Sequence, residues 1–174
     1  MRLPTKERQD QPTEGSSLTA GEAHRAPGAE HHTSESAGPP VDHLGIAVKS
    51  LATSVAVWER ALGTKASPPE EVPSQRVRVQ FLSVGSTHLE LLEPTSPDAT
   101  IAKFLEKRGE GLHHVAFHVG DLKGKLAELS AQGVRLIDAA PRQGARGRWV
   151  AFAHPSSFGG VLSEFVSDRP GGGA

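Results

Sequence analysis

Two histidines and two glutamates occur at matching places in the two halves of the chain. His43 and His114 each open a short apolar segment, and Glu90 and Glu164 each lie in a later one. The histidines are 71 residues apart and the glutamates 74, which indicates an internal duplication. Imidazole nitrogens and carboxylate oxygens are good ligands for divalent metal ions. The four side chains, called the quartet below, therefore predict a metal centre with an approximate two-fold arrangement.

Taken singly, each member of the quartet is better explained as a partly exposed or hydrogen-bonded side chain. The duplication favours ligation, because chance placement of polar residues seldom repeats the same residue types in both halves. Two neutral imidazoles and two carboxylates balance a dication and leave two positions of an octahedral ion open for water or a chelating substrate. Such a site suits Co²⁺, Mn²⁺, Ni²⁺, Fe²⁺ or Mg²⁺ better than structural Zn²⁺. The chain has no cysteine, so it offers no thiolate ligand.

The period of a β-strand places the quartet on one face. Alternate residues of a strand share a face, so His43 and His114 point away from the large apolar residues of their own segments. The two glutamates point away from their neighbours by the same count, and we expect all four side chains to face one cup. His113 falls on the opposite, helix-facing side, while His88 and His118 fall at the rim of the cup or just outside the quartet.

The apolar pattern predicts the same order of elements twice. The first module, at about 41–94, has a strand, a helix that Ser50 caps and Gly63 ends, a loop rich in Pro and Glu, and a hairpin. A short helix bridges to the second module, at about 111–167. This module repeats a strand and a helix, and its further strands begin with an extended segment at 134–137.

Two tandem βαβββ modules can pair to wrap one sheet around a cup. We therefore expect an α+β fold with a curved, cup-like mixed sheet and helices outside, formed by residues 40–168. Residues 1–39 are poor in apolar residues and read as a disordered N-terminal tail, and residues 169–174 read as a flexible C-terminus.

The composition argues against several classes of partner. The formal net charge is −1, and no apolar run is long enough to span a bilayer, so neither nucleic acid nor a membrane is an expected partner. The N-terminal segment lacks the apolar core of a secretory signal and contains several acidic residues, unlike an organellar transit peptide. We expect a cytoplasmic location.

The segment from residue 41 to 166 resembles methylmalonyl-CoA epimerase, a family of the vicinal oxygen chelate superfamily. The resemblance rests on five motifs, which are DHLGIAV at 42–48, LELLEP at 89–94, IAKFLEK at 101–107, GLHHVAF at 111–117, and HP at 154–155 followed by GGVLSE at 159–164. It implies the vicinal oxygen chelate fold, an acyl-CoA substrate and a homodimer. It also implies a divalent ion, commonly Co²⁺, held by His43, Glu90, His114 and Glu164.

The activity that the resemblance implies is interconversion of (R)- and (S)-methylmalonyl-CoA through a metal-stabilised enediolate. Glu164 is the predicted catalytic residue for one proton transfer at C2, although a carboxylate that also binds the ion is a weaker base. Some relatives carry a second glutamate in the strand where this chain has Val79 and Gln80, so the second acid/base is left open.

Three arginines in a Gly-rich loop are candidate substrate-binding residues, because guanidinium groups pair well with phosphate oxygens. They are Arg142, Arg146 and Arg148. A solvated basic loop explains them equally well.

Other functions stay open at this point. A glyoxalase I type isomerase uses the same ligand set and differs in substrate, which would be a glutathione hemithioacetal. A non-enzymatic ligand-binding member of the fold would keep the cup and lose the quartet. An extradiol dioxygenase would need two histidines and one glutamate, with a position free for dioxygen.

Overall fold

The computed structural model describes residues 38–171. Most of the predicted N-terminal tail, and the last three residues of the predicted flexible C-terminus, lie outside the described residues. In the described part of the chain, no helix is both long and apolar enough to cross a membrane.

The first module has the predicted βαβββ order, and the first strand after its helix is short. Its elements are β1 (Val41–Ala47), α1 (Leu51–Leu62), β2 (Glu70–Val72), β3 (Val77–Val84) and β4 (Thr87–Pro94). Helix α1 begins where the Ser50 side chain accepts a hydrogen bond from the Thr53 backbone N–H. It ends at Gly63, whose φ of 64° is a left-handed conformation that glycine adopts without steric cost. Strand β2 lies in the stretch that the sequence indicated as a loop.

The second module repeats this order after the bridging helix α2 (Thr100–Arg108). Its elements are β5 (Gly111–His118), α3 (Leu122–Ala131), β6 (Arg142–Gln143), β7 (Trp149–Ala153) and β8 (Ser163–Ser167), with single turns η1 (Ala145–Gly147) and η2 (Pro155–Ser157). The expected strand at 134–137 is reduced to one bridge between Leu136 and Ala153, and β6 lies further along the chain.

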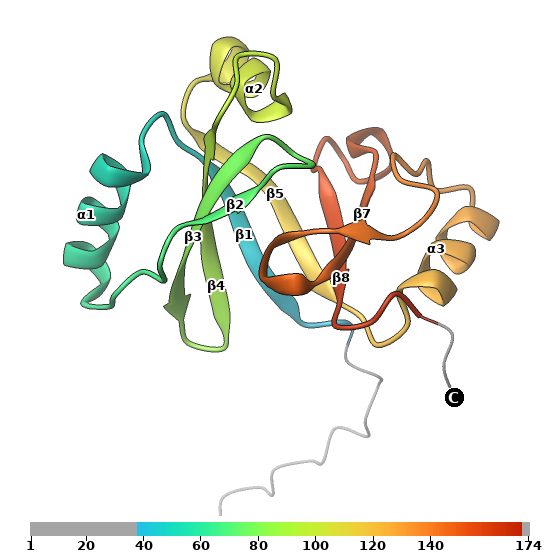
Figure 1. Ribbon diagram of the computed structural model, residues 1–174. Helices are drawn as coiled ribbons and strands as arrows, with labels where there is room; N and C mark the ends of the chain where they lie inside the picture. Colours follow the sequence, from blue (N-terminus) through green and yellow to red (C-terminus); the bar gives the residue numbers. More distant parts are fainter. Residues whose placement is uncertain (1–37, 172–174) are drawn as a thin grey trace, which may run out of the picture. The chain divides into compact units, whose positions relative to one another are not determined.

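The eight strands form one mixed sheet in the order β2-β3-β4-β1-β5-β8-β7-β6. Strands β1 and β5 pair antiparallel and join the modules, while β4 lies parallel to β1 and β8 parallel to β5. The sheet curls, with α1 outside one half and α3 outside the other (Figure 1). The predicted fold class is confirmed.

Equivalent leucines at the start of the two outer helices fill the core between helix and sheet. Leu51 of α1 packs with Leu82 and Leu91, and Leu122 of α3 packs with Phe165. Leu51 is 3% exposed and Leu122 fully buried. Burying these large side chains on the convex face leaves the concave face free for polar residues.

The two helices should contribute comparably to stability. We expect Leu51→Ala and Leu122→Ala each to lower the free energy of unfolding by about 2–5 kcal/mol, because each leaves a cavity. Urea denaturation followed by circular dichroism measures this loss. The control is Leu112→Ala, at a side chain that is 56% exposed, which should change stability by less than about 0.5 kcal/mol. A negligible loss at either buried leucine would contradict the packing.

Candidate metal centre

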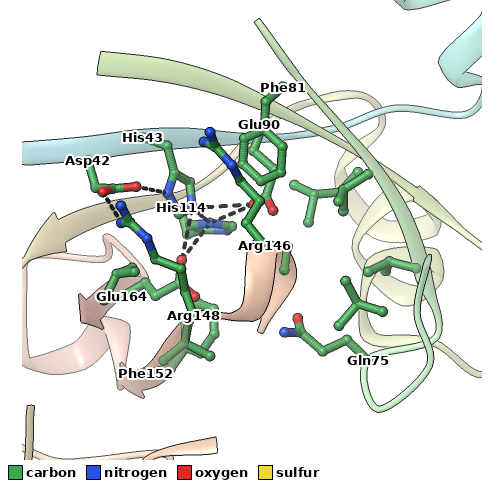
Figure 2. Close-up of a pocket in the computed structure, with 17 residues that line it drawn as sticks. Asp42, His43, Gln75, Phe81, Glu90, His114, Arg146, Arg148, Phe152 and Glu164 are labelled. Carbon is green, nitrogen blue, oxygen red and sulfur yellow. Dashed lines mark hydrogen bonds and ion pairs between the residues drawn. The ribbon is translucent and has the colours of Figure 1, made fainter. Parts of the chain in front are cut away.

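The structure brings all four members of the quartet together on the concave face (Figure 2). They come from the four central strands, His43 from β1, Glu90 from β4, His114 from β5 and Glu164 from β8. All four residues are buried, with 2–6% of their surface exposed. His114 needs the glycine opposite it in β1, because a Cβ at Gly45 would overlap the imidazole ring.

The ligand atoms of the quartet converge to within a few ångströms. His43 Nε2 lies 3.1 Å from His114 Nε2, 3.3 Å from Glu90 Oε2 and 3.0 Å from Glu164 Oε2. His114 Nε2 lies 3.5 Å from Glu90 Oε2 and 3.1 Å from Glu164 Oε2. Bonds of about 2.0–2.2 Å to one ion put adjacent ligand atoms about 3 Å apart, so these spacings fit a shared divalent cation.

One oxygen of the quartet agrees with this fit. Glu164 Oε2 is buried, and in the described residues it lies 3.0 and 3.1 Å from the imidazole nitrogens of His43 and His114 without the alignment of a hydrogen bond. A buried carboxylate oxygen is costly unless a cation lies beside it, which here is either a protonated imidazole or a metal ion. His43, Glu90 and His114 alone offer ligand atoms that all lie within 4.8 Å of one another, so the donor set can hold a metal ion.

In the metal-free protein, the carboxylates keep both imidazoles protonated. Burial alone would lower the pKa of His43, but hydrogen bonds to Asp42, Glu164 and Glu90 outweigh it and raise the pKa to about 12. The pKa of His114 rises to about 9, because the charge of Glu164 and its hydrogen bond exceed the effect of burial. Burial would raise the pKa of Glu90, yet the two imidazoles lower it to about 2.

Two further residues contact the Nδ1 atoms of His43 and His114, on the side of each imidazole away from the quartet. Asp42 Oδ1 lies 2.8 Å from His43 Nδ1, and Asp42 Oδ2 accepts a hydrogen bond from Arg148 at 2.6 Å. His113 Nδ1 lies 3.0 Å from His114 Nδ1. Contrary to the prediction, His113 is therefore not on the face covered by the outer helix α3 but on the side of His114, where it contacts Phe104 of α2. Burial and the charge of His114 lower the pKa of His113 to about 4, so its imidazole is neutral near pH 7.

Two neighbouring spaces lie beside the quartet. A cavity of about 30 Å³, enough for an ion or a water molecule, is lined by the quartet together with Val79, Phe81 and Phe152. A chamber of about 430 Å³ adjoins it and shares Gln75 and His114 as lining residues. The chamber extends between His113 and the start of α2.

The three predicted substrate-binding arginines lie around these spaces and differ in their surroundings. Arg148 contacts Asp42 and Asp168 and is held by two carboxylates. Arg142 contacts Asp138 and lines the chamber. Arg146 lies over the Phe81 ring at 4.9 Å, and no ion pair is found for it in the described part of the chain. A role in binding phosphate stays a prediction for all three.

A carboxylate that the sequence analysis missed also lies on the concave face. Glu70 of β2 is directly opposite Val79 of β3, which lines the small cavity, and opposite residues of antiparallel strands share a face. Glu70 Oε1 accepts a hydrogen bond from the Arg146 backbone N–H at 2.8 Å. A three-residue strand is too short to give a sequence pattern, so only the strand pairing reveals this position.

Several known proteins are similar to this chain in sequence and in fold. Residues 42–152 match the Glyoxalase/Bleomycin resistance protein/Dioxygenase superfamily. The Bacillus subtilis protein YqjC is 46% identical over 129 residues, covering 74% of this chain and 92% of that protein. The mitochondrial methylmalonyl-CoA epimerase of Bos taurus is 35% identical over 125 residues, which is 71% of each chain.

A solved structure agrees with this relationship. A methylmalonyl-CoA epimerase in complex with methylmalonyl-CoA and NH₄⁺ superposes with a TM-score of 0.72 at 35% identity, covering 75% of this chain and 95% of that one. The sheet is thus that of a vicinal oxygen chelate protein. The chain belongs to the methylmalonyl-CoA epimerase family within this superfamily, and it is an enzyme of the isomerase class.

Metal binding should release protons and weaken as the pH falls. Both imidazoles are protonated at pH 7 without metal, since their raised pKa values lie above 7. Binding an ion at Nε2 displaces those protons, so Co²⁺ affinity should rise by up to about 100-fold per pH unit between pH 6 and 8. Calorimetric titration in buffers of different ionisation enthalpy measures both quantities. An affinity independent of pH in this range would contradict the assignment.

Proposed function

We propose that this protein epimerises (R)- and (S)-methylmalonyl-CoA with a divalent metal ion held by the quartet. The observation that carries the proposal is the convergence of two imidazole nitrogens and two carboxylate oxygens in a buried cavity, where each imidazole Nε2 lies 3.0–3.5 Å from the other Nε2 and from both carboxylate oxygens. We propose methylmalonyl-CoA as the substrate because the relatives include the bovine epimerase and an epimerase structure that contains methylmalonyl-CoA.

When bound, the ion would supply positive charge to the thioester oxygen, where negative charge develops as the C2 proton leaves. His43, Glu90, His114 and Glu164 would hold it. The apolar walls formed by Val79, Phe81 and Phe152 exclude water from C2, which strengthens these electrostatic interactions.

Inversion at C2 needs two proton-transferring groups, one on each face of the reacting carbon. Glu164 on β8 is our proposal for one of them, acting through a carboxylate oxygen that is free of the ion. Glu70 is our proposal for the other, because β2 and β8 lie in different halves of the curled sheet and the register opposite Val79 places Glu70 on the concave face. Some relatives carry a glutamate in the strand that contains Val79, but the Val79 side chain has no group that can carry a proton. Glu70 lies directly opposite it.

The chamber has the size and the polar rim to receive the thioester arm of an acyl-CoA. We place Arg142, which lines the chamber, beside the thioester arm, and Arg146 and Arg148 at the small cavity. Co²⁺ as the native ion, a homodimeric assembly and a cytoplasmic location are predictions that rest on the sequence alone.

Deuterium exchange tests the activity. The Co²⁺-loaded protein in D₂O should place deuterium at C2 of methylmalonyl-CoA and equilibrate the two epimers, because removal and return of the proton pass through solvent-exchanging groups. NMR of the thioester measures both. The comparison substrate is the hemithioacetal of glutathione and methylglyoxal. Turnover of that compound alone, or no C2 exchange with Co²⁺, Mn²⁺, Ni²⁺, Fe²⁺ or Mg²⁺, would overturn the proposal.

Separating exchange from inversion tests the two proton-transferring groups. Glu70→Gln should slow epimerisation by about 10²–10⁴-fold, yet C2 exchange should persist for the epimer whose proton faces Glu164. Glu71→Gln is the matched control, since Glu71 is exposed and opposite Arg78. Wild-type epimerisation by Glu70→Gln would exclude Glu70.

Glu164→Gln should depress turnover more than it weakens substrate binding. The metal content must be measured in the same sample, because Glu164 is also a proposed ligand.

A further inference from the structure

Two β-bulges interrupt the junction between the modules, one in each strand. From Val41 to His43, β1 advances two residues while β5 advances one, so Asp42 is the extra residue. From Gly45 to Ile46, β5 advances two residues while β1 advances one, so the extra residue is His113. A bulge leaves its extra residue outside the regular alternation and redirects its side chain.

The redirected side chains occupy equivalent places in the duplication. Asp42 precedes His43 and His113 precedes His114, at the same offset of 71 residues that relates the two ligands. Each side chain meets the Nδ1 atom of its neighbouring imidazole, at 2.8 Å for Asp42 and 3.0 Å for His113. In a regular strand, these side chains would point away from the imidazoles that they contact.

We propose that Asp42 and His113 are paired positioning residues that fix Nε2 as the metal-binding atom of both histidines. An imidazole that binds an ion through Nε2 carries its hydrogen on Nδ1, which then donates to an acceptor outside the ligand shell. The Asp42 carboxylate accepts from His43, and the unprotonated Nδ1 of His113 accepts from His114. This inference rests on the metal centre of the proposed function.

The two acceptors have different charges and different supports. Asp42 is an anion held in place by Arg148, which also contacts Asp168. His113 packs edge-on against the Phe104 ring, 4.9 Å between centroids, and lines the large chamber. If Nδ1 of His113 accepts, its hydrogen must lie on Nε2. The site therefore has an anionic acceptor behind one ligand and a neutral acceptor, bordering the chamber, behind the other.

Co²⁺ affinity tests the positioning role without relying on activity. Asp42→Leu and His113→Leu remove the acceptor and should each weaken Co²⁺ binding by about 10–100-fold, the usual effect of losing such a partner. Asp42→Asn and His113→Asn keep an acceptor oxygen and should retain most of the affinity. His154→Leu is the matched control, because His154 contacts Ser156 on η2 and lines neither space. Chelator competition gives the dissociation constants, and thermal melts confirm folding.

A spectroscopic measurement on the wild type needs no variant. In the Zn²⁺-loaded protein, long-range ¹H–¹⁵N correlation should show Nε2 of both His43 and His114 bound to the ion and Nδ1 protonated. Either histidine bound through Nδ1, or leucine variants with wild-type Co²⁺ affinity and an unchanged visible Co²⁺ spectrum, would overturn the positioning role. Failure of the wild type to bind any divalent ion would overturn the metal centre and the positioning role together.

Discussion

The mutual approach of four ionisable side chains in a buried cavity governs this structure. Two carboxylates cannot both stay charged away from water without a compensating cation, because the cost of burial and their repulsion add. The protein offers two kinds of compensation. Without metal, protons on His43 and His114 balance Glu90 and Glu164, as the raised pKa values of the imidazoles indicate. A divalent ion would replace those protons with the same total charge, so the cavity suits either state.

The duplication explains how one sheet assembles such a site. Antiparallel pairing of β1 with β5 places equivalent residues near a local two-fold axis, and β4 and β8 flank the pair as parallel neighbours. Each histidine also has an equivalent aromatic neighbour, with ring centroids 6.1 Å apart for His43 and Phe81 and 5.4 Å apart for His114 and Phe152. Each module thus supplies one imidazole, one carboxylate and one aromatic wall.

The sequence predicts the parts of this structure that depend on residue periodicity and repetition. The fold class, the grouping of the quartet and the helix ends at Ser50 and Gly63 follow from patterns that extend over many residues. The short strand β2 and the two bulges do not, because pairing with a distant strand creates them and no local pattern encodes that pairing. For this reason the sequence pattern predicts a loop at Glu70 and places His113 on the face opposite to the one it occupies.

The departures from symmetry matter as much as the repeat, because an acyl-CoA has unlike groups on the two sides of C2. Around His43 the surroundings are ionic, with Asp42, Arg148 and Asp168 linked in series. Around His114 they are neutral, and His113 borders the chamber. In the binding mode proposed above, the thioester arm lies in the chamber and the free carboxylate faces Arg146 and Arg148. In that binding mode, a symmetric ligand set binds an asymmetric substrate in one orientation only, so each face of C2 would meet a different proton-transferring group.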